Sequence, residues 1–268
     1  MSKNLYIVPY DFTEVGQKAL EYALFISKSV QTEIKLVYIA ESRPKGMKMQ
    51  QKLNQIKEKT VSSPGVEITT LVRVGNIFSD IGAIAKKEGA QLIIMGTHGA
   101  KGLQGVFGSH AMKVVRSASC PLLIVQKETD ISDVDNILVP IDLTKESMQV
   151  INIAGDLANI LKAKVHVIAE EQSDEMLSTR IKNRVSILTK QYEDRNIKAN
   201  VAYVKNSGAY SKKVMNFAKK NNSDLIAIAY HTESFLPQFD KFAQDLITNK
   251  PCLPVLILNS KQASALYF

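Results

Sequence analysis

The sequence predicts an α/β protein made of two tandem, doubly wound domains, each a five-stranded parallel sheet with helices on both faces. Short apolar runs alternate with amphipathic stretches along the chain, as expected for strands joined by helical crossovers. The alternation occurs twice, and the second half repeats motifs of the first. The 268 residues, 45% of them hydrophobic, are enough for two domains of about 130 residues, each with its own core.

The two halves are most alike where each begins. The segment Asn4–Thr13 reads N-L-Y-I-V-P-Y-D-F-T, and Asn136–Thr144 reads N-I-L-V-P-I-D-L-T. Further along, Lys35–Glu41 recurs as Lys164–Glu170, and Ala85–Met95 recurs as Ala218–Ile228. Because such a repeat marks a duplicated structural unit, we predict one domain at 1–130, a second at 135–260 and a tail at 261–268.

The first half is expected to begin with a strand and a capped helix. Leu5–Pro9 is an apolar run of strand length. Asp11 or Thr13 is then placed to cap a helix that runs to about Val30, with apolar residues along one face. A second apolar run at Ile34–Ala40 predicts the next strand.

The remaining elements of the first half are predicted from the spacing of the apolar residues and from the turn residues between them. Met47–Lys59 is a charged amphipathic helix, and Val66–Val74 alternates like a strand. The later predicted elements are a helix at Ile77–Lys87, a strand at Gln91–Met95, a helix at Ser109–Ser117 and a strand at Pro121–Gln126. Parallel strands of this kind place ligands at their carboxyl ends, near the point where strand order reverses.

A glycine-rich stretch follows the fourth predicted strand. Residues 95–110 read M-G-T-H-G-A-K-G-L-Q-G-V-F-G-S-H, with glycines at 96, 99, 102, 105 and 108. Glycine adopts positive φ freely and lets a ligand approach the backbone closely. A glycine-rich turn that ends at a helix start offers free N–H groups to an anion, above all to phosphate. A merely flexible loop is the alternative interpretation.

Composition and charge exclude several classes of protein. The net charge is +8, and residues 1–132 carry 17 Lys and Arg against 11 Asp and Glu, which suits a small anionic ligand. The lysines are not interleaved with aromatic residues, so we expect no nucleic-acid partner. We expect no membrane association and a cytoplasmic location, since no apolar run spans a bilayer and the N-terminus lacks a signal-peptide pattern. Cys120 and Cys252 have no metal-site spacing and are expected to pack as small apolar residues.

These motifs resemble the universal stress protein family in its tandem two-domain form. The resemblance rests on V-P-Y-D at Val8–Asp11, V-G-N-I at Val74–Ile77, I-I-M-G-T-H-G from Ile93, G-S at Gly108-Ser109 and C-P-L-L-I-V from Cys120. It covers nearly the whole chain. It implies a nucleotide-binding, HUP-like fold, a role in stress response, and ATP or another adenine nucleotide, with or without Mg²⁺, as the ligand.

The resemblance also implies a set of site residues. Asp11 would contact the nucleoside, and Ile39 would pack on the adenine. Gly96, His98 and Gly99 would contact the ribose and the first phosphates, while Gly108, Ser109 and His110 would close over the phosphate tail. Pro9 and Met95 complete the predicted set. The family motif G-x2-G-x9-G-(S/T) is one residue shorter here, because eight residues separate Gly99 from Gly108.

The second half lacks the glycines of the first. Ala229-Tyr230-His231-Thr232 stands where the first half has Gly96 to Gly99, and Lys241-Phe242 falls near the position of Gly108-Ser109. Since each position gains a Cβ, we predict one nucleotide site per chain and a structural or interaction role for the second half. The resemblance further implies an intramolecular pseudo-dimer through Leu122–Val125 and Val255–Leu258, with a homodimer left open.

Two alternatives stay open from the sequence. Asp11 and Asp142 are suited to be helix N-caps and nothing more. The second hypothesis for the function, after adenine-nucleotide binding, is a nucleotide-independent scaffold for an unknown protein partner. No general base, nucleophile or metal-ligand set stands beside the glycine stretch, and there is no Walker motif. We therefore expect no efficient catalysis and at most slow ATP hydrolysis.

Overall fold

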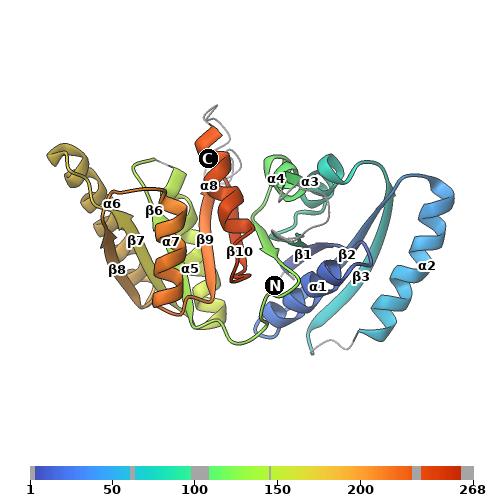
Figure 1. The fold of residues 1–268 in the computed structure, drawn as a ribbon. Helices are drawn as coiled ribbons and strands as arrows, with labels where there is room; N and C mark the ends of the chain where they lie inside the picture. Colours follow the sequence, from blue (N-terminus) through green and yellow to red (C-terminus); the bar gives the residue numbers. More distant parts are fainter. Residues whose placement is uncertain (1–3, 61–63, 98–108, 145, 231–236, 261–268) are drawn as a thin grey trace. The chain divides into compact units, whose positions relative to one another are not determined.

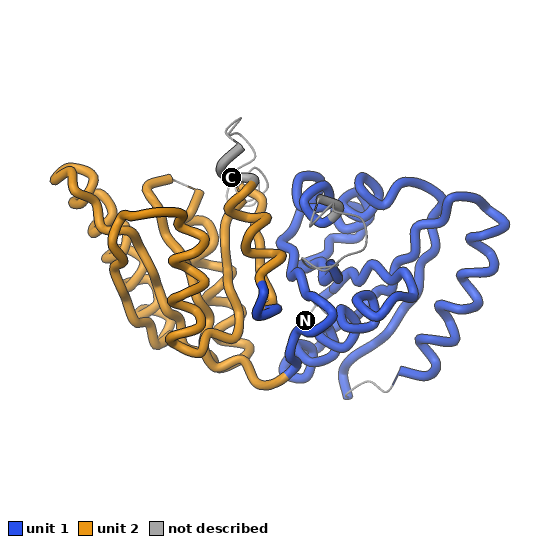
Figure 2. The backbone as a smooth tube through the Cα atoms, viewed as in Figure 1, with its two compact units in different colours: residues 1–131, 250–252 blue, residues 132–249, 253–268 orange. Residues whose placement is uncertain are grey.

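A computed structural model describes residues 4–60, 64–97, 109–144, 146–230 and 237–260, with the backbone alone for 109–110 and 237–240. The chain divides into two compact units, and Figure 2 shows them in two colours. Unit 1 comprises Met1–Ile131 and Lys250–Cys252, and unit 2 comprises Ser132–Asn249 and Leu253–Phe268.

In the residues of unit 1 that the structure describes, the strands are parallel and lie in the order β3-β2-β1-β4-β5 (Figure 1). Their bounds are β1 Asn4–Pro9, β2 Thr32–Ala40, β3 Val66–Val74, β4 Leu92–Gly96 and β5 Leu122–Val125. The chain moves outward from β1 to β3 and then crosses back to β4. Right-handed crossovers therefore place the helices before and after that reversal on opposite faces, and the switch point lies between β1 and β4.

The helices of unit 1 are α1 Glu14–Ser27, α2 Arg43–Lys59, α3 Ile77–Glu88 and α4 Ser109–Ser117. Helix α1 packs on β1, β4 and β5, α2 packs on β2 and β3, and α3 packs on α4. Helix α2 begins four residues before the predicted start, because Pro44 lies in its first turn, where a missing N–H costs nothing. Helix α1 ends before Val30, since the N–H groups of Lys28 and Val30 donate to carbonyls three residues back.

The central strands of unit 1 form its core. Strand β5 and the first four residues of β4 are buried, and Ile93, Ile94, Leu122 and Leu123 have no exposed surface. Strands covered on both faces read as continuous apolar runs, which is why these two were evident in the sequence.

Unit 2 repeats this topology with the strand order β8-β7-β6-β9-β10, all parallel. The strands are β6 Asn136–Ile141, β7 Lys164–Glu170, β8 Ala199–Val204, β9 Leu225–Tyr230 and β10 Val255–Asn259. The helices are α5 Val150–Leu161, α6 Glu175–Asp194, α7 Tyr210–Lys220 and α8 Pro237–Ile247, with a 3-10 turn at Glu146–Met148. The predicted fold class, two doubly wound α/β domains in tandem, is confirmed.

The register of β7 corrects one part of the sequence repeat. Pro9 pairs with Val37 in unit 1, and the equivalent Pro140 pairs with Ile168 in unit 2. Val37 and Ile168 therefore correspond, and Glu170 takes the position of Ile39. The match of Lys35–Glu41 to Lys164–Glu170 is therefore offset by two residues from the register of the strands. A shift of two residues keeps each side chain on the same face of the sheet, so the hydrophobic pattern does not reveal it.

In the part of the chain that the structure describes, no helix has both the length and the apolar character needed to cross a membrane.

Candidate functional site

A pocket opens at the carboxyl ends of β1, β2 and β4 in unit 1, where the strand order reverses. It holds about 430 Å³ of empty space, part of it in the open mouth. This position is where open α/β sheets bind their ligands. The lining residues are Pro9, Tyr10, Asp11, Val15, Gly16, Val37, Tyr38, Ile39, Ile77, Met95 and Gly96.

Five of the ten predicted site residues line this pocket, although they are spread over 88 positions of the chain. They are Pro9, Asp11, Ile39, Met95 and Gly96. Three others, His98, Gly99 and Gly108, lie outside the described residues. Ser109 and His110 begin α4, where the backbone alone is described. The structure thus brings the described half of the predicted set together.

Asp11 holds the turn that leads from β1 into α1. Its Oδ1 accepts hydrogen bonds from the Thr13 N–H at 3.0 Å and from the Thr13 hydroxyl at 2.5 Å. The Thr13 hydroxyl oxygen in turn accepts from the Gly16 N–H at 3.2 Å, so Thr13 is the N-cap of α1. Asp11 is exposed at the pocket and positions the cap without being the cap.

Two glycines allow the close packing around this turn. A Cβ on Gly16 would lie 2.6 Å from Asp11 Oδ1, so the absence of a side chain makes room for the carboxylate. A Cβ on Gly96 would lie 2.4 Å from the Val15 carbonyl oxygen and 2.7 Å from Val15 Cβ. Gly96 is therefore required for the close approach of α1 to β4. The sequence motif predicted a ligand contact for Gly96 and did not predict this packing role.

An aromatic cluster borders the pocket, and sequence reasoning missed it. The Phe12 ring lies 5.3 Å from the Tyr10 ring, edge to face, and 5.6 Å from the Tyr38 ring, measured between centroids. The Tyr10 hydroxyl donates to Gln17 Oε1 at 2.7 Å. Burial, followed by the nearby charge of Asp11, raises the pKa of Tyr10, so this phenol stays neutral and remains a hydrogen-bond donor.

Other pocket residues were also absent from the predicted set. Val15 and Gly16 come from the first turn of α1, Val37 from β2, and Ile77 from the start of α3. The alternation of β2 and the V-G-N-I motif were the available signals for Val37 and Ile77. Neither signal distinguishes a residue that lines a pocket from one that fills a core.

The described part of the site combines apolar surface with a few polar groups. It offers apolar walls from Ile39 and Met95, one carboxylate and the backbone ends of three strands. Among the described residues, no group of three or more His, Cys, Asp or Glu side chains is placed to hold a metal ion. A planar, partly apolar ligand with hydroxyl groups matches this arrangement.

Comparisons with known proteins agree with the fold and identify a family. The sequence profile of the universal stress protein family matches the chain twice, over residues 6–126 and 134–259. A universal stress protein of Methanocaldococcus jannaschii is 31% identical over 145 residues, which are 47% of this chain and 85% of the relative. One of Bacillus subtilis is 27% identical over 150 residues, 46% of this chain and 99% of the relative. The crystal structure of a universal stress protein from Archaeoglobus fulgidus has a similar fold, with a TM-score of 0.78 at 18% identity, over 97% of this chain and 100% of that one.

Proposed function

Because the chain belongs to the universal stress protein family, with two family domains in tandem, we propose that unit 1 binds an adenine nucleotide, ATP foremost, in a stress-response role. One observation carries the proposal. Residues that the family resemblance names as nucleotide contacts, and that lie far apart in the sequence, line one pocket at the switch point of the sheet.

The chemistry of the pocket supports a nucleoside as the occupant. Ile39 and Met95 offer apolar surface for the faces of a purine base. The Asp11 carboxylate is an acceptor for ribose hydroxyls, and its bonds to Thr13 fix its orientation before any ligand arrives. A preorganised acceptor loses less side-chain entropy on binding than a mobile one.

The phosphates would extend from the end of β4 toward the start of α4. These two elements flank the glycine-rich stretch, since β4 ends at Gly96 and α4 begins at Ser109. The N-terminus of a helix carries unpaired N–H groups and a partial positive charge, both of which favour a phosphate. Any Mg²⁺ would be held chiefly by the phosphates themselves.

Isothermal titration calorimetry with ATP, ADP and AMP on nucleotide-free protein tests the proposal. We expect one molecule bound per chain. Mass spectrometry of the supernatant from heat-denatured, freshly purified protein gives an independent readout of a copurified nucleotide. The proposal is wrong if none of the three nucleotides binds at millimolar concentration and no adenine nucleotide is released.

The second unit, the location and the chemistry of the protein have their own expectations. Unit 2 would act as a structural or interaction partner, and the association of the units through β5 and β10 stays a prediction. The cytoplasmic location and the upper limit of slow ATP hydrolysis are likewise predictions from the sequence. The nucleotide-independent scaffold is the alternative that the release experiment separates from ATP binding.

A further inference from the structure

The place in unit 2 that corresponds to the pocket of unit 1 can be identified from strand register. Tyr10 and Ile141 both follow the proline of the first strand, and Val37 and Ile168 are the partners of those prolines. Helices α3 and α7 each follow the third strand of their unit, and they begin at Ile77 and Tyr210. Tyr10, Val37 and Ile77 line the pocket of unit 1, so their counterparts mark the same crevice in unit 2.

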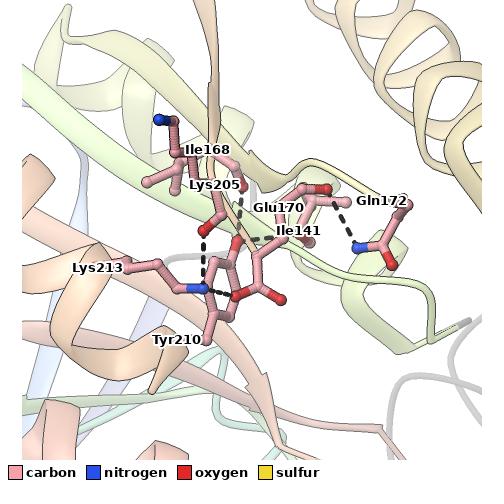
Figure 3. A network of polar contacts seen from close by, with 7 residues as sticks. All are labelled: Ile141, Ile168, Glu170, Gln172, Lys205, Tyr210 and Lys213. Carbon is pink, nitrogen blue, oxygen red and sulfur yellow. Dashed lines mark hydrogen bonds and ion pairs between the residues drawn. The ribbon is translucent and has the colours of Figure 1, made fainter. Parts of the chain in front are cut away.

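The Tyr210 side chain occupies this crevice. Its hydroxyl lies 3.0 Å from the Ile141 carbonyl oxygen and 2.8 Å from the Ile168 carbonyl oxygen, and it donates its proton to this pair (Figure 3). Ile141 is the last residue of β6, and Ile168 lies two residues before the end of β7. In unit 1 the corresponding position holds Ile77, which has no hydroxyl and is 37% exposed.

The ring of Tyr210 has partners of its own. The Phe242 ring stacks on it, with centroids 5.6 Å apart and planes 11° from parallel. Lys213 Nζ lies 5.8 Å from the ring centroid. It forms an ion pair with Glu170 and donates a hydrogen bond to the Lys205 carbonyl oxygen at 3.1 Å (Figure 3). Glu170 stands where unit 1 has Ile39. Stacking and a cation over a ring face each stabilise an aromatic side chain in addition to its burial.

The hydroxyl end of Tyr210 is the inner end. Burial raises the pKa of Tyr210 well above its usual range, and the negative charges of Asp142 and Glu170 act in the same direction. The residue as a whole is half-buried. Two backbone carbonyls at one end of Tyr210 and an aromatic ring against its face thus surround this side chain, and a small-molecule site combines polar and apolar groups in the same way.

We propose that unit 2 retains a ligand crevice for a phenol-class ring and fills it permanently with its own Tyr210 side chain. Tyr210 acts as an intramolecular ligand, so this crevice of unit 2 stays occupied, whereas the corresponding crevice of unit 1 is open. The inference does not rest on nucleotide binding by unit 1, since every contact that carries it lies in unit 2.

The full-length Tyr210→Ala variant tests the proposal with p-cresol, the side chain of tyrosine as a free molecule. We expect p-cresol to bind this variant with a dissociation constant of about 1 mM, typical of a ligand of so few atoms. Binding is read by NMR titration. Tyr203→Ala is the matched control, because Tyr203 is 39% exposed on β8. Neither the Tyr203→Ala variant nor the wild type should bind p-cresol. Equal behaviour of the two variants overturns the proposal.

A second measurement does not depend on the fold of a cavity variant. In protein labelled with 13C-tyrosine, the ring signal that disappears in Tyr210→Phe identifies Tyr210. We expect this signal in the wild type to stay unchanged through pH 10, where a free phenol is half ionised. We also expect Tyr210→Phe to unfold at a lower urea concentration than Tyr203→Phe. Titration of Tyr210 near pH 10, with no loss of stability in Tyr210→Phe, overturns the proposal.

Discussion

The Asp11 carboxylate oxygen Oδ1 accepts hydrogen bonds from both the backbone N–H and the hydroxyl of Thr13, at 3.0 and 2.5 Å. Asp142 and Thr144 make the same pair of bonds in unit 2. The two aspartates therefore share one structural role, the support of a turn after the first strand. Asp11 also lines the pocket of unit 1, so comparison with Asp142 allows the structural and ligand roles to be separated by experiment.

Asp11→Ala and Asp142→Ala should both lower stability, and of the two only Asp11→Ala should weaken nucleotide binding. Each removes two bonds that hold a turn, and each should lower the free energy of unfolding by about 1 kcal/mol. Because a hydrogen bond to a charged group is worth about 1.5–3 kcal/mol, Asp11→Ala should weaken nucleotide binding by at least about tenfold. Urea unfolding and calorimetry measure the two effects. Equal nucleotide affinity in both variants would show that Asp11 only supports its turn.

Gly96→Ala should destabilise unit 1 whether or not a ligand is present. The added Cβ would lie 2.4 Å from the Val15 carbonyl oxygen, and backbone cannot move aside as a side chain can. We expect a loss of about 1–3 kcal/mol, as for other overpacked sites, measured by urea unfolding without nucleotide. The reverse change in unit 2, Ala229→Gly, should cost about 1 kcal/mol or less. Unchanged stability with lost nucleotide binding would assign Gly96 to the ligand alone.

Much of the fold follows from the sequence because its local signals are strong. Helix α3 is bounded by Asn76, whose side chain caps it, and by Gly89, whose φ of 68° suits glycine. The register of β7 could not be predicted, since a two-residue slip preserves the alternation of a strand. The role of Tyr210 was equally hidden, because its hydroxyl bonds to backbone carbonyls, and those leave no mark in a sequence.

The candidate site, like the fold, could be predicted from the sequence only in part. Asp11 and Ile39 were predicted through the family resemblance, whose motifs name positions and not contacts. Tyr38 and Val15 were missed, because their place at the pocket depends on how β2 and α1 meet the end of β1. The packing role of Gly96 depends likewise on the distance between a helix and a strand, a quantity that periodicity does not specify.

Cys120 should make the protein less stable as the pH rises above about 8.5, where a thiol in an unfolded chain ionises. Burial raises the pKa of Cys120 to about 12. The folded state thus binds a proton that the unfolded state releases, and this contribution is fully present below about pH 8.5 and is lost progressively toward pH 12. Urea unfolding at pH 7 and pH 10 should show a smaller fall for Cys120→Ala than for the wild type. An identical fall in both would mean that other groups account for it.

Ile77→Tyr should close the open crevice of unit 1 by giving it the residue that fills unit 2. A tyrosine at the start of α3 can reach the carbonyl ends of β1 and β2, as Tyr210 reaches those of β6 and β7. If the nucleotide occupies this crevice, its affinity should fall at least about tenfold, a loss of 1.4 kcal/mol or more. Calorimetry measures it, circular dichroism confirms the fold, and Ile77→Val is the control that keeps the crevice open. Full nucleotide affinity in folded Ile77→Tyr would place the ligand elsewhere, while the p-cresol test of Tyr210 would stand unchanged, since it concerns unit 2 alone.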